Sequence, residues 1–107
     1  MAGISTHVLD AALGRPASGV PVSLVCPDGT VYSGVTDEDG RVGDLFTGPL
    51  AAGVHRATFD TGTYFAATGQ AGFFPEVTLA FTVDPVRGHH HVPLLLSPYS
   101  YTTYRGS

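Results

Sequence analysis

The sequence has no lysine, one cysteine and few charged residues of either sign. Charged residues make up 13% of the chain, which is about half of the ~25% usual in soluble domains. All five cations other than histidine are arginines, and the formal net charge is −4. Nucleic acids and anionic membranes bind clusters of basic side chains, so we expect neither a nucleic-acid partner nor a membrane partner.

The single cysteine, Cys26, excludes an intrachain disulfide and a cluster of thiolate metal ligands. It ends the alternating apolar segment 20–26, where a buried structural thiol is more common than a nucleophile. The sequence also lacks the ~20 consecutive apolar residues of a membrane span. Its first residues lack the basic start and apolar run of a signal peptide. We therefore expect a cytoplasmic protein.

The scarcity of charge also bears on assembly. A small domain exposes most of its polar positions, so a weakly charged surface indicates that part of it contacts other protein. Homo-oligomerisation is the simplest form of such contact. A monomer with a surface rich in threonine, serine and glycine is the alternative.

Glycine and proline are plentiful, with 14 and 8 residues in 107. Together with many β-branched residues, this composition predicts short strands joined by turns and excludes a helical bundle. The length fits a single domain spanning residues 1–107.

Eight segments have the alternation or the composition of strands, so we expect an all-β, two-sheet β-sandwich. One short helix is expected over residues 63–68, with Thr63 as its N-cap. Residues 43–53 are expected to be mostly connection. Because proline cannot donate to a sheet ladder, Pro93 predicts an edge or irregular position for its strand. The eight strand segments are 4–10, 20–26, 31–36, 41–42, 54–60, 77–83, 89–96 and 99–105.

Histidines and one arginine are the candidates for chemistry. Strand alternation puts His7 on one face with Ser5, and it puts His89 and His91 on one face with His90 on the other. Arg41 directly follows the turn at residues 37–40, where a short strand would fix its direction.

These residues leave several interpretations open. His89 and His91 could share a zinc ion, with His7 or Asp84 as a third ligand. Without metal, a histidine near its neutral pKa could take a proton from water while an arginine holds an anionic or carbonyl oxygen. Each histidine, taken alone, could also be a hydrogen-bonded or exposed strand residue.

The segment 89–107, HHHVPLLLSPYSYTTYRGS, resembles the C-terminal region of 5-hydroxyisourate hydrolases, the transthyretin-related enzymes of urate breakdown. The closing Tyr-Arg-Gly-Ser is the part that separates these enzymes from transthyretin. Segments 5–10, 36–41 and 69–77 agree with the family in the same order. The family usually has an aromatic residue at the position of His90, which we expect to face away from His91.

The resemblance implies a transthyretin-like sandwich of about eight strands and one short helix. It further implies a homotetramer with active sites in a central channel between dimers. The implied reaction adds water to a ring carbonyl of 5-hydroxyisourate in purine catabolism. The product is 2-oxo-4-hydroxy-4-carboxy-5-ureidoimidazoline, and neither a metal nor a cofactor is implied.

The resemblance also implies which residues act. The catalytic residues would be His7, Arg41 and His91. We expect the two histidines to position and deprotonate water, and Arg41 to bind the acidic ring and stabilise the oxyanion. A transthyretin-like carrier of a small hydrophobic ligand in the same channel is the alternative function. The implied substrate contacts are His7, Arg41, Tyr104, Arg105, Gly106 and Ser107.

The final segment also specifies two sides of a strand. Alternation over residues 99–105 places Tyr104 and Arg105 on opposite sides. We expect one of them to face the substrate and the other a partner group.

Overall fold

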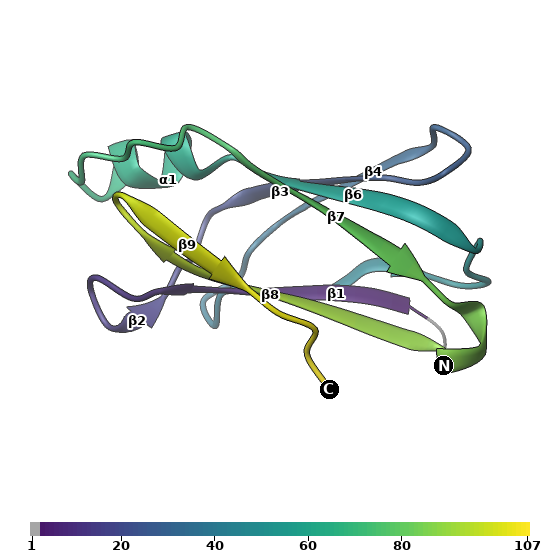
Figure 1. The fold of residues 1–107 in the computed structure, drawn as a ribbon. Helices are drawn as coiled ribbons and strands as arrows, with labels where there is room; N and C mark the ends of the chain where they lie inside the picture. Colours follow the sequence, from purple (N-terminus) through teal and green to yellow (C-terminus); the bar gives the residue numbers. More distant parts are fainter. Residues whose placement is uncertain (1–2) are drawn as a thin grey trace.

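A computed structural model describes residues 3–107, which form two β-sheets packed face to face with one α-helix at one end (Figure 1). The first sheet has the order β2-β1-β8-β9, with β5 also paired to β1, and the second has the order β4-β3-β6-β7. This arrangement confirms the expected all-β sandwich. The elements are β1 (Gly3–Asp10), β2 (Arg15–Pro16), β3 (Pro21–Val25), β4 (Val31–Val35), β5 (Arg41–Thr47), β6 (Gly53–Phe59), α1 (Thr61–Ala67), β7 (Val77–Val83), a 3-10 turn η1 (Pro85–Arg87), β8 (His89–Ser97) and β9 (Ser100–Thr103).

The core lies between the two sheets and follows the strand alternation. On β1, Ile4 and Val8 are fully buried, whereas His7 on the opposite face is only half-buried. Each large apolar side chain buried in this way stabilises the fold by about 1.5–3 kcal/mol. The largest buried apolar side chains are Ile4, Leu24, Phe59, Phe65, Leu94 and Leu96.

Two elements differ from the sequence expectation near the site. Residues 11–19, between the expected strands 4–10 and 20–26, contain the two-residue strand β2, which pairs with the end of β1. The strand expected at 41–42 continues to Thr47 as β5. The register between β1 and β5 shifts between Ile4 and Thr6, and this bulge accommodates Gly43 within the strand. Gly43, which had indicated a loop, therefore lies in a β-bulge.

The helix begins two residues earlier than expected, and its N-cap is Asp60, not Thr63. The Asp60 carboxylate accepts hydrogen bonds from the Thr63 backbone N–H at 3.1 Å and from the Thr63 hydroxyl at 2.7 Å. Aspartate is a stronger N-cap than threonine. Within residues 3–107, no helix is long and apolar enough to cross a membrane.

A buried polar network ties the helix to the first strand. Asp10 is 1% exposed, and its carboxylate accepts from the Tyr64 hydroxyl at 2.6 Å, the Gln70 amide at 3.0 Å and the Leu13 N–H at 2.8 Å. Burial alone would raise the pKa of Asp10, but these hydrogen bonds outweigh it and hold the pKa below its usual value. Burial, followed by the contact with Asp10, raises the pKa of Tyr64 to about 12.

Pro93 lies in a central strand, because β8 pairs with β1 on one side and β9 on the other. The expected edge position is therefore wrong, but the alternative of an irregular position holds, because the ladder with β9 is interrupted at this residue. The His91 and Pro93 carbonyls accept from the Gly106 N–H and the Thr103 hydroxyl, so both face the side of β9. Pairing with β9 ends at Leu94 and Thr103. The missing N–H of Pro93 thus lies where the ladder has already been interrupted.

Candidate active site

Strand register brings the candidate residues onto one face of the first sheet. Strand β1 lies between β5 and β8, with His7 opposite Arg41 and Ser5 opposite His91. The pairing of β1 with β8 is parallel. The core-facing side chains of β1 and β8 point to the opposite face of the sheet, so this polar face is open to solvent.

A tight turn positions two of these side chains. The Asp37 carboxylate accepts from the backbone N–H groups of Asp39 at 2.9 Å and Arg41 at 3.0 Å. Gly40 has φ of 76°, and a β-carbon there would collide with the backbone of β1. The Asp39 carbonyl oxygen lies 2.8 Å from His7 Nε2. The turn therefore fixes both the start of the Arg41 strand and the ring of His7.

The contact with Asp39 also sets the tautomer of His7. A backbone carbonyl only accepts hydrogen bonds, so His7 Nε2 must carry a proton. In the neutral ring the lone pair then lies on Nδ1. His7 is thus prepared to accept a proton at that atom.

His91 is held by a side chain on the neighbouring strand. Its Nδ1 lies 2.7 Å from the Ser5 hydroxyl oxygen. Burial, together with the positive charges of Arg41, His7 and His89, lowers the pKa of His91. The ring is therefore neutral at neutral pH and available as a base.

These residues surround a shallow pocket of about 300 Å³. His7 flanks it on the same face without lining it. The walls of the pocket combine a guanidinium, two imidazoles and two serines, and this set suits a small polar or anionic ligand. The lining residues are Ser5, Thr6, Arg41, Gly43, His89, His91 and Ser107.

The C-terminal segment closes one side of this pocket. The Gly106 N–H donates to the His91 carbonyl at 2.9 Å, outside the regular pairing of β9. A β-carbon at Gly106 would overlap the His91 ring. Only glycine allows so close an approach, which brings Ser107 to the pocket.

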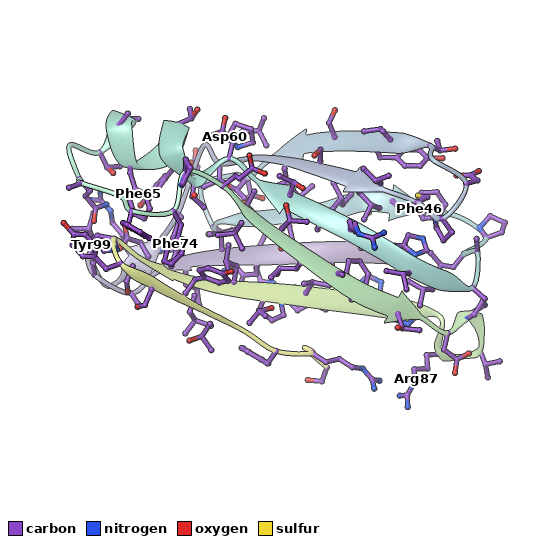
Figure 2. The ribbon with its side chains drawn as sticks, turned by 45° about the horizontal axis from the view of Figure 1, so that its top comes forward. Phe46, Asp60, Phe65, Phe74, Arg87 and Tyr99 are labelled. Atoms are coloured by element: carbon purple, nitrogen blue, oxygen red, sulfur yellow. The ribbon has the colours of Figure 1, made fainter. Side chains whose placement is uncertain are left out.

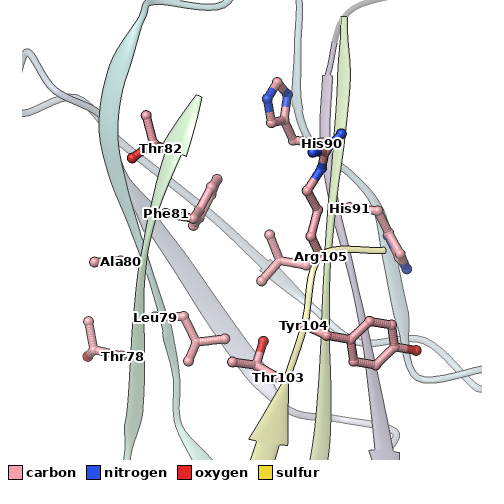
Figure 3. Close-up of a pocket in the computed structure, with 11 residues that line it drawn as sticks. Thr78, Leu79, Ala80, Phe81, Thr82, His90, His91, Thr103, Tyr104 and Arg105 are labelled. Carbon is pink, nitrogen blue, oxygen red and sulfur yellow. The ribbon is translucent and has the colours of Figure 1, made fainter. Parts of the chain in front are cut away.

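Tyr104 and Arg105 lie on opposite sides of the sheet, as the strand alternation predicts. Figure 3 shows Tyr104 on the side of His91, whereas Arg105 lies with His90 and faces Phe81. This second side borders another pocket of about 360 Å³ between β7 and the β8–β9 pair. Arg105 is thus directed away from the polar pocket, and Tyr104, although on the side of His91, lines this second pocket and not the polar one.

His90 faces the interior, away from His91, as expected. The Asp84 N–H donates to its Nε2 at 3.2 Å, so Nδ1 carries the proton of the neutral ring. Among residues 3–107, this Nδ1 is the buried side-chain nitrogen or oxygen without a hydrogen-bond partner. Burial and the nearby charge of Arg105 lower the pKa of His90. In this part of the chain, no group of three or more histidine, cysteine, aspartate or glutamate residues could hold a metal ion.

Ser5 was not among the residues expected in the site, and His89 was considered only as a possible zinc ligand. Alternation indicated that each shares a face with a candidate histidine, but it could not show that β1 and β8 are neighbours. The structure brings them together, with Ser5 Oγ at 2.8 Å from His89 Nε2. The buried Asp10 network had no sequence signal beyond the residue types themselves.

Comparison with known proteins shows the family to which this fold belongs. A sequence model of the HIUase/Transthyretin family matches residues 4–106. The chain belongs to this family. A curated relative, 5-hydroxyisourate hydrolase of Deinococcus radiodurans, is 44% identical over 114 residues, which cover 98% of this chain and 96% of the relative.

Solved structures agree with the HIUase/Transthyretin assignment. Klebsiella pneumoniae 5-hydroxyisourate hydrolase matches with a TM-score of 0.88 at 39% identity, covering 100% of this chain and 94% of that chain. Transthyretin from Sparus aurata matches with a TM-score of 0.88 at 34% identity, covering 99% and 97%. The sandwich is therefore transthyretin-like. Because the family includes both an enzyme and transthyretin, the function must be argued from the site.

Proposed function

We propose that this chain hydrolyses 5-hydroxyisourate by adding water to a ring carbonyl, giving 2-oxo-4-hydroxy-4-carboxy-5-ureidoimidazoline. The observation that carries the proposal is the meeting of His7, Arg41 and His91 on one open face. The curated relatives named 5-hydroxyisourate hydrolase support it, at 44% identity in the Deinococcus radiodurans protein.

Each of the three residues has a role that its surroundings suit. His91, neutral because its pKa is lowered, and His7, with its lone pair on Nδ1, position the water and exchange its proton. Arg41 is exposed on the same face, where its guanidinium can bind the acidic ring and the oxyanion that forms on the carbonyl.

The C-terminal residues complete the proposed site. Gly106 places Ser107 on the pocket wall, and Tyr104 lies on the same side of the sheet as His91 (Figure 3). We assign substrate contacts to these three residues. A contact from Arg105 stays a prediction, and it would require the segment after β9 to turn.

The alternative function is a carrier of a small hydrophobic ligand, as the transthyretin match would allow. The polar pocket argues against a carrier, because Arg41 and two imidazoles bring charge and proton acceptors to a surface that an apolar ligand would not select. A carrier would also have no need for the fixed tautomer of His7.

We further propose that the chain forms a homotetramer and acts in the cytosol. Strands β7 and β9 are free edges of the two sheets, and such edges readily pair with another copy. Beside them, Phe73 is 69% exposed and Tyr99 is 70% exposed. Figure 2 shows Phe74 and Tyr99 at the helix end of the sandwich. The unpaired thiol of Cys26 suits a reducing compartment, which cell fractionation can test.

One assay tests the enzyme against both alternatives. The purified protein is added to freshly generated 5-hydroxyisourate, and the ultraviolet absorbance is followed with and without a chelator. Accelerated decay in both conditions is expected. If 5-hydroxyisourate decays faster only without chelator, the result would support the zinc alternative. If the protein does not accelerate the decay in either condition, the carrier function would be favoured.

A further inference from the structure

One hydroxyl group lies between two imidazoles at the centre of the polar face. Ser5 Oγ is 2.7 Å from His91 Nδ1 and 2.8 Å from His89 Nε2. Ser5 is only 7% exposed, so water does not readily replace either contact. The parallel pairing of β1 and β8 fixes the spacing, with Ser5 opposite His91.

A serine hydroxyl has a single proton, which limits how this chain of contacts can be arranged. In the first arrangement, His91 Nδ1–H donates to Ser5 and the Ser5 hydroxyl donates to His89 Nε2. In the second arrangement both bonds are reversed, and the proton of neutral His91 then lies on its Nε2. Of these two, only the first leaves a lone pair on His91 Nε2. A third, in which both rings donate to Ser5, would leave the proton of the buried Ser5 hydroxyl without a partner among the described residues.

The chemistry selects the first arrangement. A base that takes a proton from water becomes an imidazolium, in which both ring nitrogens are donors. His91 Nδ1 must then donate, and Ser5 Oγ is the acceptor within reach. The Ser5 hydroxyl proton is directed to His89, which makes its oxygen a better acceptor. This acceptor matters because burial, and then the charges of Arg41, His7 and His89, oppose positive charge on His91.

We propose that Ser5 and His89 are positioning residues that fix His91 with its proton on Nδ1 and its Nε2 free as the base. This inference rests on the proposed hydrolase function. As the water oxygen bonds to the ring carbonyl carbon, one water proton passes to His91 Nε2. The same proton passes to the leaving ring nitrogen as the carbon–nitrogen bond breaks. Ser5 and His89 keep their own protons throughout the cycle.

The test compares Ser5→Ala with Ser5→Thr, which keeps the hydroxyl and suits a strand. Ser23→Ala on β3, in the other sheet, is the matched control. The first readout is the nitrogen-15 NMR shift of the His91 ring without substrate. We expect the Nδ1–H tautomer in the wild type and the Ser23→Ala and Ser5→Thr variants, and loss of that preference in Ser5→Ala.

The second readout is the steady-state rate on 5-hydroxyisourate. Ser5→Ala should lower kcat about ten- to a hundredfold, as is usual when a partner that orients a histidine is removed. KM should change less than about threefold, and Ser5→Thr should recover most of the rate. His89→Ala changes an exposed residue and should lower kcat in the same direction, which keeps the test available if Ser5→Ala does not fold.

Three outcomes would overturn the inference. They are a wild-type His91 with its proton on Nε2, a Ser5→Ala variant with an unchanged tautomer and rate, and a wild-type activity that a chelator abolishes and Zn²⁺ restores. An inactive wild-type protein would instead contradict the hydrolase function. In that case the tautomer readout still decides the positioning role.

Discussion

His91 is the residue whose protonation most affects the proposed reaction. Its pKa lies below the usual ~6.5 of histidine, so the ring stays neutral at pH values where an ordinary histidine would be half protonated. We expect the acid limb of the kcat/KM profile to have its midpoint below pH 6.5. Rates measured between pH 4.5 and 9 in buffers of constant ionic strength test this. A midpoint above pH 7 would contradict it.

Arg41 and His7 should contribute to chemistry and little to stability. Both lie outside the buried core, so Arg41→Gln and His7→Asn should leave the melting temperature nearly unchanged. The rate on 5-hydroxyisourate should fall by about two orders of magnitude or more, the usual loss for an oxyanion donor or a general base. Arg56→Gln, an exposed arginine on the opposite sheet, is the control and should remain fully active. Either variant with full activity would remove its residue from the site.

Asp10 should make stability depend on pH. Its pKa is lower in the folded chain than in the unfolded chain, so its contribution is complete above the unfolded pKa of about 3.9 and is lost as the pH falls through the folded value. Tyr64→Phe removes one hydrogen bond to this buried carboxylate and should cost about 1–3 kcal/mol at pH 7. Urea unfolding at pH 7 and at pH 3 should show that the cost shrinks at pH 3. The exposed Tyr101→Phe is the control, and an equal cost at both pH values would refute the assignment.

At the scale of elements, alternation predicted β3, β6 and β7 because each has one buried and one more exposed face. It failed where a residue has a role that depends on its neighbours. Gly43 suggested a connection, but the bulge between β1 and β5 accommodates it. Pro93 suggested an edge or an irregular position, and only the pairing shows which: its missing N–H meets an interrupted ladder in a central strand. In both cases the deciding information is the pairing partner, which the local sequence does not contain.

The segment after β9 gives an element-scale prediction. Gly106→Ala would force a β-carbon into the His91 ring, so the segment must move away from the pocket. Activity should fall at least about tenfold, with a small change in melting temperature, because residues 104–107 pack outside the core.

Deleting residues 104–107 should abolish hydrolysis while the β-rich circular dichroism spectrum and the assembly persist.

The matched control is Thr102→Ala, which changes an exposed residue of β9 away from the pocket. It should keep the wild-type rate. A deletion variant that hydrolyses 5-hydroxyisourate at the full rate would show that the terminal segment has no part in the site.

The whole molecule should be larger than one chain in solution. We expect light scattering to give four times 11.1 kDa, about 44 kDa. Phe73→Ser removes an exposed aromatic side chain that stacks edge-to-face on Phe74 beside the free strand edges. It should shift the mass toward smaller species at low concentration. Val86→Ser, at a still more exposed apolar residue on η1, is the control. A stable, active 11.1 kDa monomer would contradict the assembly.

The site as a whole could be predicted only in part. Residue types and the likeness of segment 89–107 to known hydrolases indicated His7, Arg41 and His91. The contacts that fix their rings, from Asp39 and Ser5, depend on which strands are neighbours and on how one turn is shaped. Both are properties of the folded molecule, because residues 5 and 91 are far apart in the chain.

The parallel pairing of β1 with β8 has a consequence for biosynthesis. A domain made from its N-terminus on the ribosome produces β1 early, and β8, the strand that must lie beside it, emerges near the end, before β9 alone among the strands. The Ser5–His91 contact spans 86 positions of the chain. A nascent chain can therefore form the β3–β4 and β3–β6 pairings of the second sheet while the polar face is still incomplete. Competence for catalysis is acquired only when synthesis of the domain is nearly finished.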